Sequence, residues 1–196
     1  MKTPQVFFTK IIFMCIVAIV VSLTSCAQEN NSKTTAKNDQ TATVEAPKMD
    51  IQSAIIAGNL DIVRQHIKAG SDLNTKEAMS GSTPLVTAIT FNKLDIAKAL
   101  IDAKADLSIK NNDGSTALHT AAFFGRVEMV QLLIDANADK TIKNNFGATA
   151  REIVLSDFAQ LKPIYEMLIL QLKPMGFTLD IATVKKAHPV IAMMLQ

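Results

Sequence analysis

The side chains best suited to chemistry in this sequence are two cysteines and three histidines. Cys15 and Cys26 offer thiols, whereas His66, His119 and His188 offer imidazoles that act as bases or bind metals. No two histidines are four residues apart, so no helix brings a pair onto one face as a zinc protease does. We therefore expect no metal site, and the cysteines need a separate explanation.

The acidic side chains also lack a catalytic pattern. Asp72, Asp106 and Asp139 recur at matching points of an internal repeat, where turn formation explains them better than acid–base catalysis. The sequence contains no phosphate-binding loop, no dinucleotide-binding fingerprint and no G-x-S-x-G elbow. We predict that the protein is not an enzyme and that it uses no cofactor and no small-molecule substrate.

Residues 1–25 have the composition of a secretory signal peptide. Lys2 and Lys10 flank a polar start, and residues 11–21 then form an uncharged apolar run. This run is short of the roughly 20 residues that a helix needs to cross a bilayer. A basic start, a short apolar run and small residues after it are typical of a cleaved signal. The alternative is a retained membrane anchor, for which residues 6–8 would have to extend the run.

The segment after the apolar run carries a more specific pattern, Leu23-Thr24-Ser25-Cys26. It resembles the bacterial lipobox, in which a leucine and two small residues precede a cysteine. The resemblance implies that Cys26 is lipidated, that cleavage removes residues 1–25, and that several acyl chains anchor the protein in a membrane. Each buried CH₂ of such a chain contributes about 0.8 kcal/mol. The alternative is that Cys26 is an ordinary small residue near a different cleavage site.

Cleavage would leave the chain with neither a free thiol nor a net charge. Cys15 leaves with the signal, and lipid occupies Cys26. Residues 1–25 hold two of the 20 basic residues and no acid, so 18 basic residues remain against 18 acidic ones. A neutral chain lacks the basic surface that nucleic acid requires. We therefore expect no nucleic-acid partner.

Residues 26–47 are polar and contain no aromatic residue. Such a segment cannot bury enough apolar surface to offset its ordering entropy, so we predict a disordered tether with an end-to-end distance of about 25 Å. Ala27 follows the cysteine, whereas enterobacterial lipoproteins that stay at the inner membrane carry an Asp there. We therefore expect a lipid-anchored protein of the cell envelope, at the outer membrane and facing the periplasm.

An internal repeat organises the rest of the chain. The segment that begins at Ser80 (SGSTPLVTAI) recurs at Asp113 (DGSTALHTAA), 33 residues later, and the match continues from residues 94–106 to residues 127–139. This period and its T-P-L-H-x-A-like start resemble the ankyrin repeat, a turn followed by two antiparallel helices. Residues 116–121 have Ala in place of the Pro of that signature, and residues 83–88 keep the Pro but lack the His.

The resemblance predicts an all-α fold, an ankyrin-type solenoid of helix-turn-helix repeats with short β-turn fingers. The predicted domain covers residues 48–196. Its repeats fall at about 46–79, 80–112, 113–145 and 146–175, and a degenerate C-terminal cap follows at 176–196. The first copy is eroded at its front, as expected of a terminal repeat, and one extra residue near Met79 separates it from the second.

The ends of the predicted helices carry capping residues. Thr83, Thr116 and Thr149 are suited to accept a hydrogen bond from a free backbone N–H at a helix start. The predicted left-handed helix ends hold residues that favour this conformation, with one exception, Lys104. These positions are Gly58, Asn92 and Gly125 after the first helices, and Gly70, Lys104 and Asn137 after the second helices.

Aromatic residues mark a first candidate binding surface. In ankyrin folds, the two residues before the end of the first helix face a concave groove. Here these positions include Phe91, Phe123 and Phe124. Exposed rings in adjacent repeats would form an apolar strip for a protein partner. The alternative is that the rings pack between repeats or against the tail. The resemblance also assigns His119 to a hydrogen bond between repeats.

The turn tips are the second binding surface that the resemblance implies. The candidate residues there are Lys76, Glu77, Asn111, Asn112, Asp113, Asn144, Asn145 and Phe146. The alternative is ordinary turn formation, because Asn and Asp favour such turns without any partner.

The tail contains two apolar segments, residues 161–172 and 190–195, which we expect to close the end of the stack or to self-associate. The predicted function is a lipid-anchored scaffold or adaptor that binds a protein partner and contacts the membrane through its N-terminal lipid. The alternative is an inhibitor or immunity-type protein that neutralises a toxin or an envelope enzyme.

Overall fold

The computed structural model describes residues 45–196 of the chain. The expected signal peptide at residues 1–25, the lipobox with Cys26 and nearly all of the expected tether at residues 26–47 lie outside these residues. Within the described part, every regular element is a helix. In this part of the chain, no helix is both long enough and apolar enough to cross a membrane.

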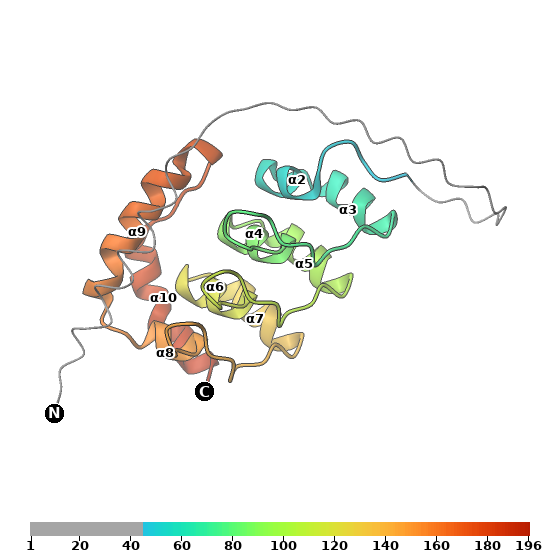
Figure 1. Ribbon diagram of the computed structural model, residues 1–196. Helices are drawn as coiled ribbons and strands as arrows, with labels where there is room; N and C mark the ends of the chain where they lie inside the picture. Colours follow the sequence, from blue (N-terminus) through green and yellow to red (C-terminus); the bar gives the residue numbers. More distant parts are fainter. Residues whose placement is uncertain (1–44) are drawn as a thin grey trace. The chain divides into compact units, whose positions relative to one another are not determined.

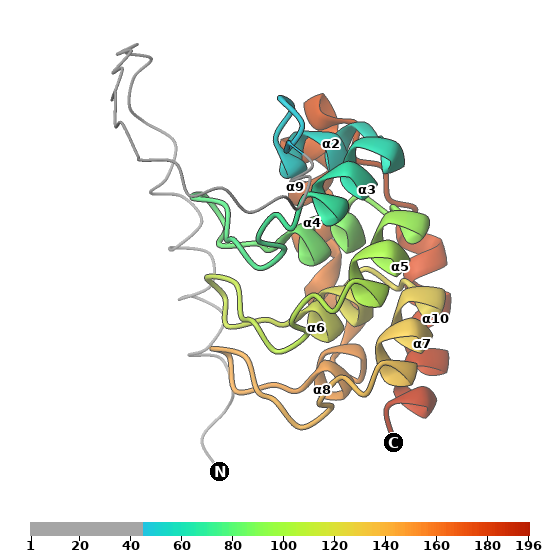
Figure 2. The same ribbon diagram turned by 90° about the vertical axis from the view of Figure 1, so that its right-hand side faces the viewer.

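Three helix pairs stack on one another in chain order (Figure 1). They are α2 (Ile51–Ala57) with α3 (Leu60–Lys68), α4 (Pro84–Thr90) with α5 (Leu94–Asp102), and α6 (Ala117–Phe123) with α7 (Val127–Asp135). First helices pack on first helices and second helices on second helices from one pair to the next. The turns that join successive pairs project to the same side as fingers (Figure 2). The expected all-helical repeat solenoid is confirmed.

The first helices begin at the expected threonines. The Thr83 hydroxyl accepts a hydrogen bond from the Val86 N–H at 3.4 Å, and the Thr149 hydroxyl accepts one from the Glu152 N–H at 3.2 Å. Pro84 occupies the first turn, where a missing N–H costs nothing because no acceptor precedes it. At Thr116 the ring of His119 accepts the backbone N–H instead, at 3.2 Å. Local sequence therefore fixes where each of these helices starts.

The helix ends adopt the left-handed conformation at all six predicted positions. Gly58, Asn92 and Gly125 follow the first helices with φ of 73°, 56° and 65°. After the second helices, φ is 71° at Gly70 and 62° at Asn137. Lys104 has φ of 67°, although a side chain with a Cβ disfavours this region. The structure thus stores backbone strain at Lys104.

The main core runs along the stack between first and second helices. Four of its large side chains lie at corresponding places of the repeats and have 0 or 1% exposure: Leu85, Leu100, Leu118 and Leu133. A single helix pair could not bury these faces alone, so each repeat depends on its neighbours.

The helices of the fourth repeat do not follow the expected division of residues 146–196. Its first helix, α8 (Ala150–Val154), is followed by α9 (Phe158–Leu172), a short 3₁₀ turn, η2 (Lys173–Met175), and α10 (Ile181–Met194). In the complete repeats, each second helix contacts its own first helix and the preceding second helix. α10 makes these contacts, with α8 and α7, whereas α9 packs against α10.

The expected repeat at 146–175 and separate cap at 176–196 therefore need correction. The fourth helix pair is α8 and α10, and residues 158–175 form a helical insertion between them. Asp180 caps α10 where Lys93 and Arg126 begin the second helices before it. In α10, the buried residues Val184, Ala187 and Ile191 lie three and four residues apart. Buried residues of the other second helices have similar spacings.

Candidate interaction site

The fingers are joined to one another by a ladder of asparagine side chains. The Asn112 side-chain amide donates to the Met79 carbonyl at 2.9 Å, and the Asn145 amide donates to the Asn112 carbonyl at 3.0 Å. Parallel backbone bonds run from the Asn112 N–H to Ser80 and from the Asn145 N–H to Asp113. Asn112 and Asn145 were expected to contact a partner. The structure gives their amides a structural task, which is to fix the spacing of adjacent fingers.

Two glycines make room for this ladder. An added Cβ at Gly114 would lie 2.4 Å from Asn145 Oδ1, and one at Gly81 would lie 2.4 Å from Asn112 Oδ1. Both glycines also have positive φ, at 72° and 69°. The close approach of asparagine to glycine therefore repeats along the finger edge with the period of the sequence.

The finger tips expose apolar as well as polar side chains. Met79 is 90% exposed and Phe146 is 49% exposed, and both precede a finger glycine. Asp113, between them in the stack, is also exposed. Phe146 and Asp113 are thus accessible as expected, whereas Met79 was noted only as the extra residue between two repeats.

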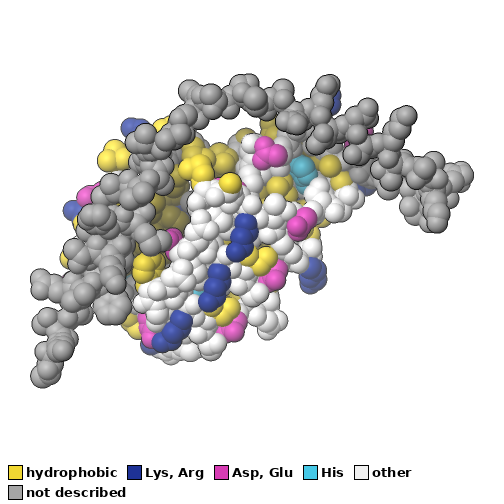
Figure 3. All heavy atoms as spheres, in the orientation of Figure 1, with side chains coloured by type: hydrophobic (Ala, Val, Ile, Leu, Met, Phe, Trp, Pro, Cys, Tyr) yellow, Lys and Arg dark blue, Asp and Glu magenta, His cyan; other side chains and the backbone are white. Residues whose placement is uncertain are grey.

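A row of lysines lies beside these tips, of which sequence reasoning singled out only Lys76. Lys76, Lys110 and Lys143 are exposed and lie one per finger. Figure 3 looks onto the fingers and shows basic side chains in a row across them. Lys110 Nζ donates to the Lys143 carbonyl at 2.9 Å, and Lys143 forms an exposed ion pair with Glu152 at 3.9 Å. The three lysines are 34 and 33 residues apart, so their near-periodic spacing could have revealed the row. The extra residue near Met79 makes the first spacing one residue longer than the second.

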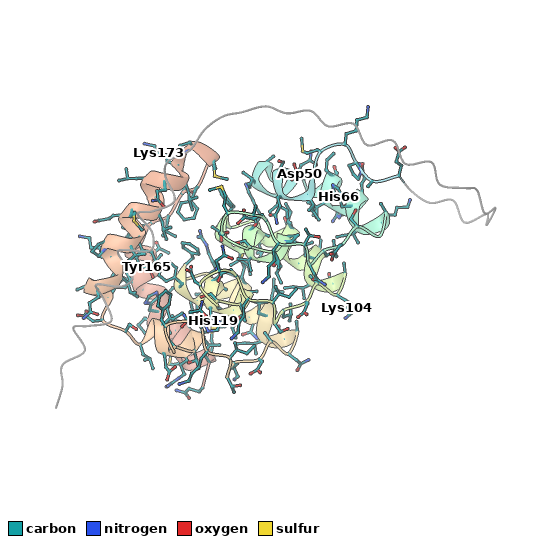
Figure 4. The ribbon with its side chains drawn as sticks, viewed as in Figure 1. Asp50, His66, Lys104, His119, Tyr165 and Lys173 are labelled. Atoms are coloured by element: carbon teal, nitrogen blue, oxygen red, sulfur yellow. The ribbon has the colours of Figure 1, made fainter. Side chains whose placement is uncertain are left out.

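His119 links the third repeat to the fourth. Its Nδ1 accepts from the Thr116 N–H, and its Nε2 lies 3.1 Å from the Ala148 carbonyl, to which it donates when neutral. Figure 4 labels this ring on α6. Burial lowers the pKa of His119, so the neutral ring is favoured. The expected hydrogen bond between repeats is present.

The predicted aromatic strip is covered by the tail. The Phe177 ring packs edge-on against Phe91 and Phe124, with centroids 6.0 and 5.6 Å away, and Tyr165 lies 4.6 Å from Phe123. Phe124 is only 6% exposed. Phe91 and Phe123 are half-buried and also pack against the tail. The expected open groove is therefore absent at Phe124, and the alternative of packing against the tail describes all three rings. The physical reason is that the inserted helix and α10 bring their own apolar face to the rings, which removes part of the ring surface from water.

Two buried polar side chains tie the tail to this edge. The Tyr165 hydroxyl, on the side of α9 that faces the repeats (Figure 4), donates to the Phe123 carbonyl at 2.7 Å. His188 Nε2 lies 3.3 Å from the same hydroxyl. Burial raises the pKa of Tyr165 and lowers the pKa of His188, so both side chains are neutral at physiological pH. The C-terminal carbonyl of α6 thus finds a partner that the helix itself cannot supply.

The remaining histidine has a structural role too. His66 Nδ1 lies 3.0 Å from the Ser71 hydroxyl, and Nε2 lies 2.8 Å from the Met49 carbonyl. Within residues 45–196, no cluster of three His, Cys, Asp or Glu side chains could hold a metal ion. All three histidines therefore serve contacts between segments of the fold.

The fold defines a class of protein, a helical repeat solenoid with finger-like turns. Residues 51–144 match the sequence family of ankyrin repeats, in three copies. Residues 51–144 therefore carry ankyrin repeats, and the described helices stack as in an ankyrin-type solenoid. Ankyrin repeats indicate a protein–protein interaction module. A comparison with curated proteins gives no match.

Proposed function

We propose that this protein is a lipid-anchored scaffold or adaptor of the bacterial cell envelope that binds a protein partner through its fingers. The observation that carries the proposal is the finger edge. It combines exposed apolar tips, Met79 and Phe146, with the lysine row at Lys76, Lys110 and Lys143. Apolar anchors give affinity at protein interfaces, and surrounding charges select a complementary partner.

The structure favours the fingers over the aromatic strip. The rings of Phe91, Phe123 and Phe124 already have partners in the tail, whereas Met79 and Phe146 face solvent. The asparagine ladder holds the finger backbones at fixed spacing. A rigid surface loses little conformational entropy when a partner binds, which favours association.

The finger proposal is tested by crosslinking in intact envelopes followed by mass spectrometry. We expect Met79→Ser combined with Phe146→Ser to lower partner recovery at least about tenfold, because truncation of an interface anchor costs roughly 1–3 kcal/mol. The matched control is Leu170→Ser, since Leu170 is 75% exposed but lies on α9. Equal recovery from the double variant and the wild type would refute binding through the fingers.

The lipid anchor rests on the lipobox pattern that ends at Cys26 and is tested separately. We expect Cys26→Ser to abolish incorporation of a tagged fatty acid and to release the protein from the membrane fraction. Cys15→Ser is the matched control, because Cys15 lies inside the apolar run. Separation of inner from outer membranes then tests the proposed location at the outer membrane, where the fingers would face the periplasm. Labelling that survives Cys26→Ser would exclude this anchor.

A further inference from the structure

A pocket of about 430 Å³ opens on the tail edge, where the third repeat meets the start of α10. On the repeat side it is lined by Asn92, Phe124 and Arg126, and on the tail side by Thr178 and Asp180. It therefore lies beside the covered aromatic cluster and opposite the end of the helix pairs that carries the fingers. Nothing in the scaffold function proposed above uses it.

Arg126 is the unusual residue of this pocket. Its Nε and Nη2 atoms are buried and have no hydrogen-bond acceptor within residues 45–196. The chain's two other arginines are engaged: Arg64 pairs with Asp61 at 3.9 Å, and Arg151 Nε donates to the Ala192 carbonyl at 3.2 Å. Charged donors without an acceptor are costly to bury. A conformer that found an acceptor would therefore be strongly favoured.

The nearby carboxylates are not paired with Arg126. Asp180 lines the same pocket, but its oxygens accept from the Ala182 N–H at 3.1 Å and from the Thr183 hydroxyl at 2.5 Å, which caps α10. Those hydrogen bonds, the one from Thr183 first, lower the pKa of Asp180 and keep it ionised. Glu128 is an exposed neighbour that forms no ion pair with Arg126. Neither carboxylate therefore accepts a hydrogen bond from the buried nitrogens of Arg126.

We propose that this pocket receives a carboxylate side chain of the partner protein and that Arg126 binds it. A guanidinium matches a carboxylate with two parallel N–H donors, which gives both strength and direction. Nε and Nη2 are buried in this structure, so binding requires the Arg126 side chain to turn toward the pocket. Asn92 and Thr178 at the rim supply further donors, and Phe124 and Val184 supply an apolar wall for the neighbouring partner residue. This inference rests on the proposed function and adds a second, acid-selective contact to it.

The test follows the arginine Nε–H signals of the full chain in detergent micelles, labelled with ¹⁵N at arginine. The probe is N-acetyl-leucine, which combines a carboxylate with one apolar side chain. We expect a saturable shift of the Arg126 signal, with the Arg64 and Arg151 signals unchanged. Calorimetric titration measures binding to the variants, and Arg126→Gln should weaken it at least about tenfold, as loss of a charged hydrogen bond implies. Arg64→Gln is the matched control and should leave binding unchanged.

Two further arms make the result decisive. Neutral N-acetyl-leucinamide should leave the Arg126 signal in place, and an equal shift with this probe would overturn the proposal. Asp180→Asn keeps a capping side chain and removes a negative charge, so binding of N-acetyl-leucine should tighten. If Asp180→Asn moves the Arg126 signal strongly before any probe is added, the arginine is already paired within the chain and the proposal fails.

Crosslinking of the Arg126→Gln variant in envelopes separates this inference from the function it rests on. If the finger double variant and Arg126→Gln each lose partner recovery, the result supports binding through the fingers and binding at the pocket. Loss on the finger variant alone, with N-acetyl-leucine causing no shift, refutes the pocket and leaves the scaffold function standing. A specific shift without any partner loss on either variant refutes partner binding at both places.

Discussion

The two edges of the repeat stack are held together by different interactions, although one 33-residue period generates both. On the finger edge, asparagine amides bond to carbonyls of the adjacent turn, and the surface stays open to solvent. On the opposite edge, aromatic rings of the repeats pack against the tail, whose Tyr165 has 0% exposure. A polar ladder leaves the finger surface available to a partner, whereas the aromatic strip serves intramolecular packing.

The largest effect is expected on the sealed edge. Tyr165→Ala removes a buried ring and its bond to the Phe123 carbonyl, so we expect a loss of about 3–5 kcal/mol in the free energy of unfolding. Leu170→Ala, on the same helix but 75% exposed, should cost less than about 0.5 kcal/mol. Urea denaturation measures both. Similar values for the two variants would mean that the tail does not seal this edge.

A smaller effect is expected where the finger ladder is tightest. Gly114→Ala combines a strained positive φ with a Cβ that would meet Asn145 Oδ1 at 2.4 Å. Gly147→Ala is the matched control, because Gly147 also has positive φ but no atom within 4 Å. We expect about 1–2 kcal/mol for the control and about 1–3 kcal/mol more for Gly114→Ala, from thermal denaturation. Equal losses would show that the ladder is loose.

Acid should weaken both edges through their buried histidines. Burial lowers the pKa of His119 near the fingers and of His188 in the tail. The unfolded chain therefore binds protons first, so this stability is complete above the unfolded pKa of about 6.5 and is lost as the pH falls toward the folded values. Each histidine contributes a slope of at most about 1.4 kcal/mol per pH unit.

Melting temperatures between pH 7 and pH 5 test the histidine contributions. The acids with lowered pKa, such as Asp106 and Glu152, titrate mainly below this range. His119→Gln and His188→Gln should each flatten the pH profile, and a difference between them shows which edge loosens first. An unchanged profile in both variants would contradict neutral burial of these rings.

The smallest effect is expected at Lys104, which belongs to neither edge. Lys104→Gly relieves a positive φ of 67° and should raise the free energy of unfolding by about 1 kcal/mol or less, because glycine's greater unfolded-state entropy offsets part of the gain. Asn137→Gly, at the matching place with φ of 62°, should gain less, since Asn tolerates this conformation. Calorimetry compares them, and a lower melting temperature for Lys104→Gly would count against a left-handed backbone there.

The sequence alone determined the features that depend on neighbouring residues. The 33-residue period is visible directly in the sequence, and the threonine caps and the six left-handed helix ends follow from residue types at short range. The role of His119 was predictable from its place in the repeat signature, and the accessibility of Phe146 from its place in a turn. Each of these rests on a few consecutive residues whose backbone preferences agree.

Only the tertiary structure decided which surfaces remain open. Residues 158–175 separate the two helices of the fourth repeat, so the period gives no sign that α10 pairs with α8. Phe91, Phe123 and Phe124 have the composition of a binding strip, but Tyr165 and Phe177, more than 40 residues from the nearest of these in sequence, cover them. Contacts between distant segments depend on how the chain returns to the stack, which local preferences do not specify. Arg126 stands out for the same reason, because only the folded structure shows that two of its guanidinium nitrogens are buried without an acceptor.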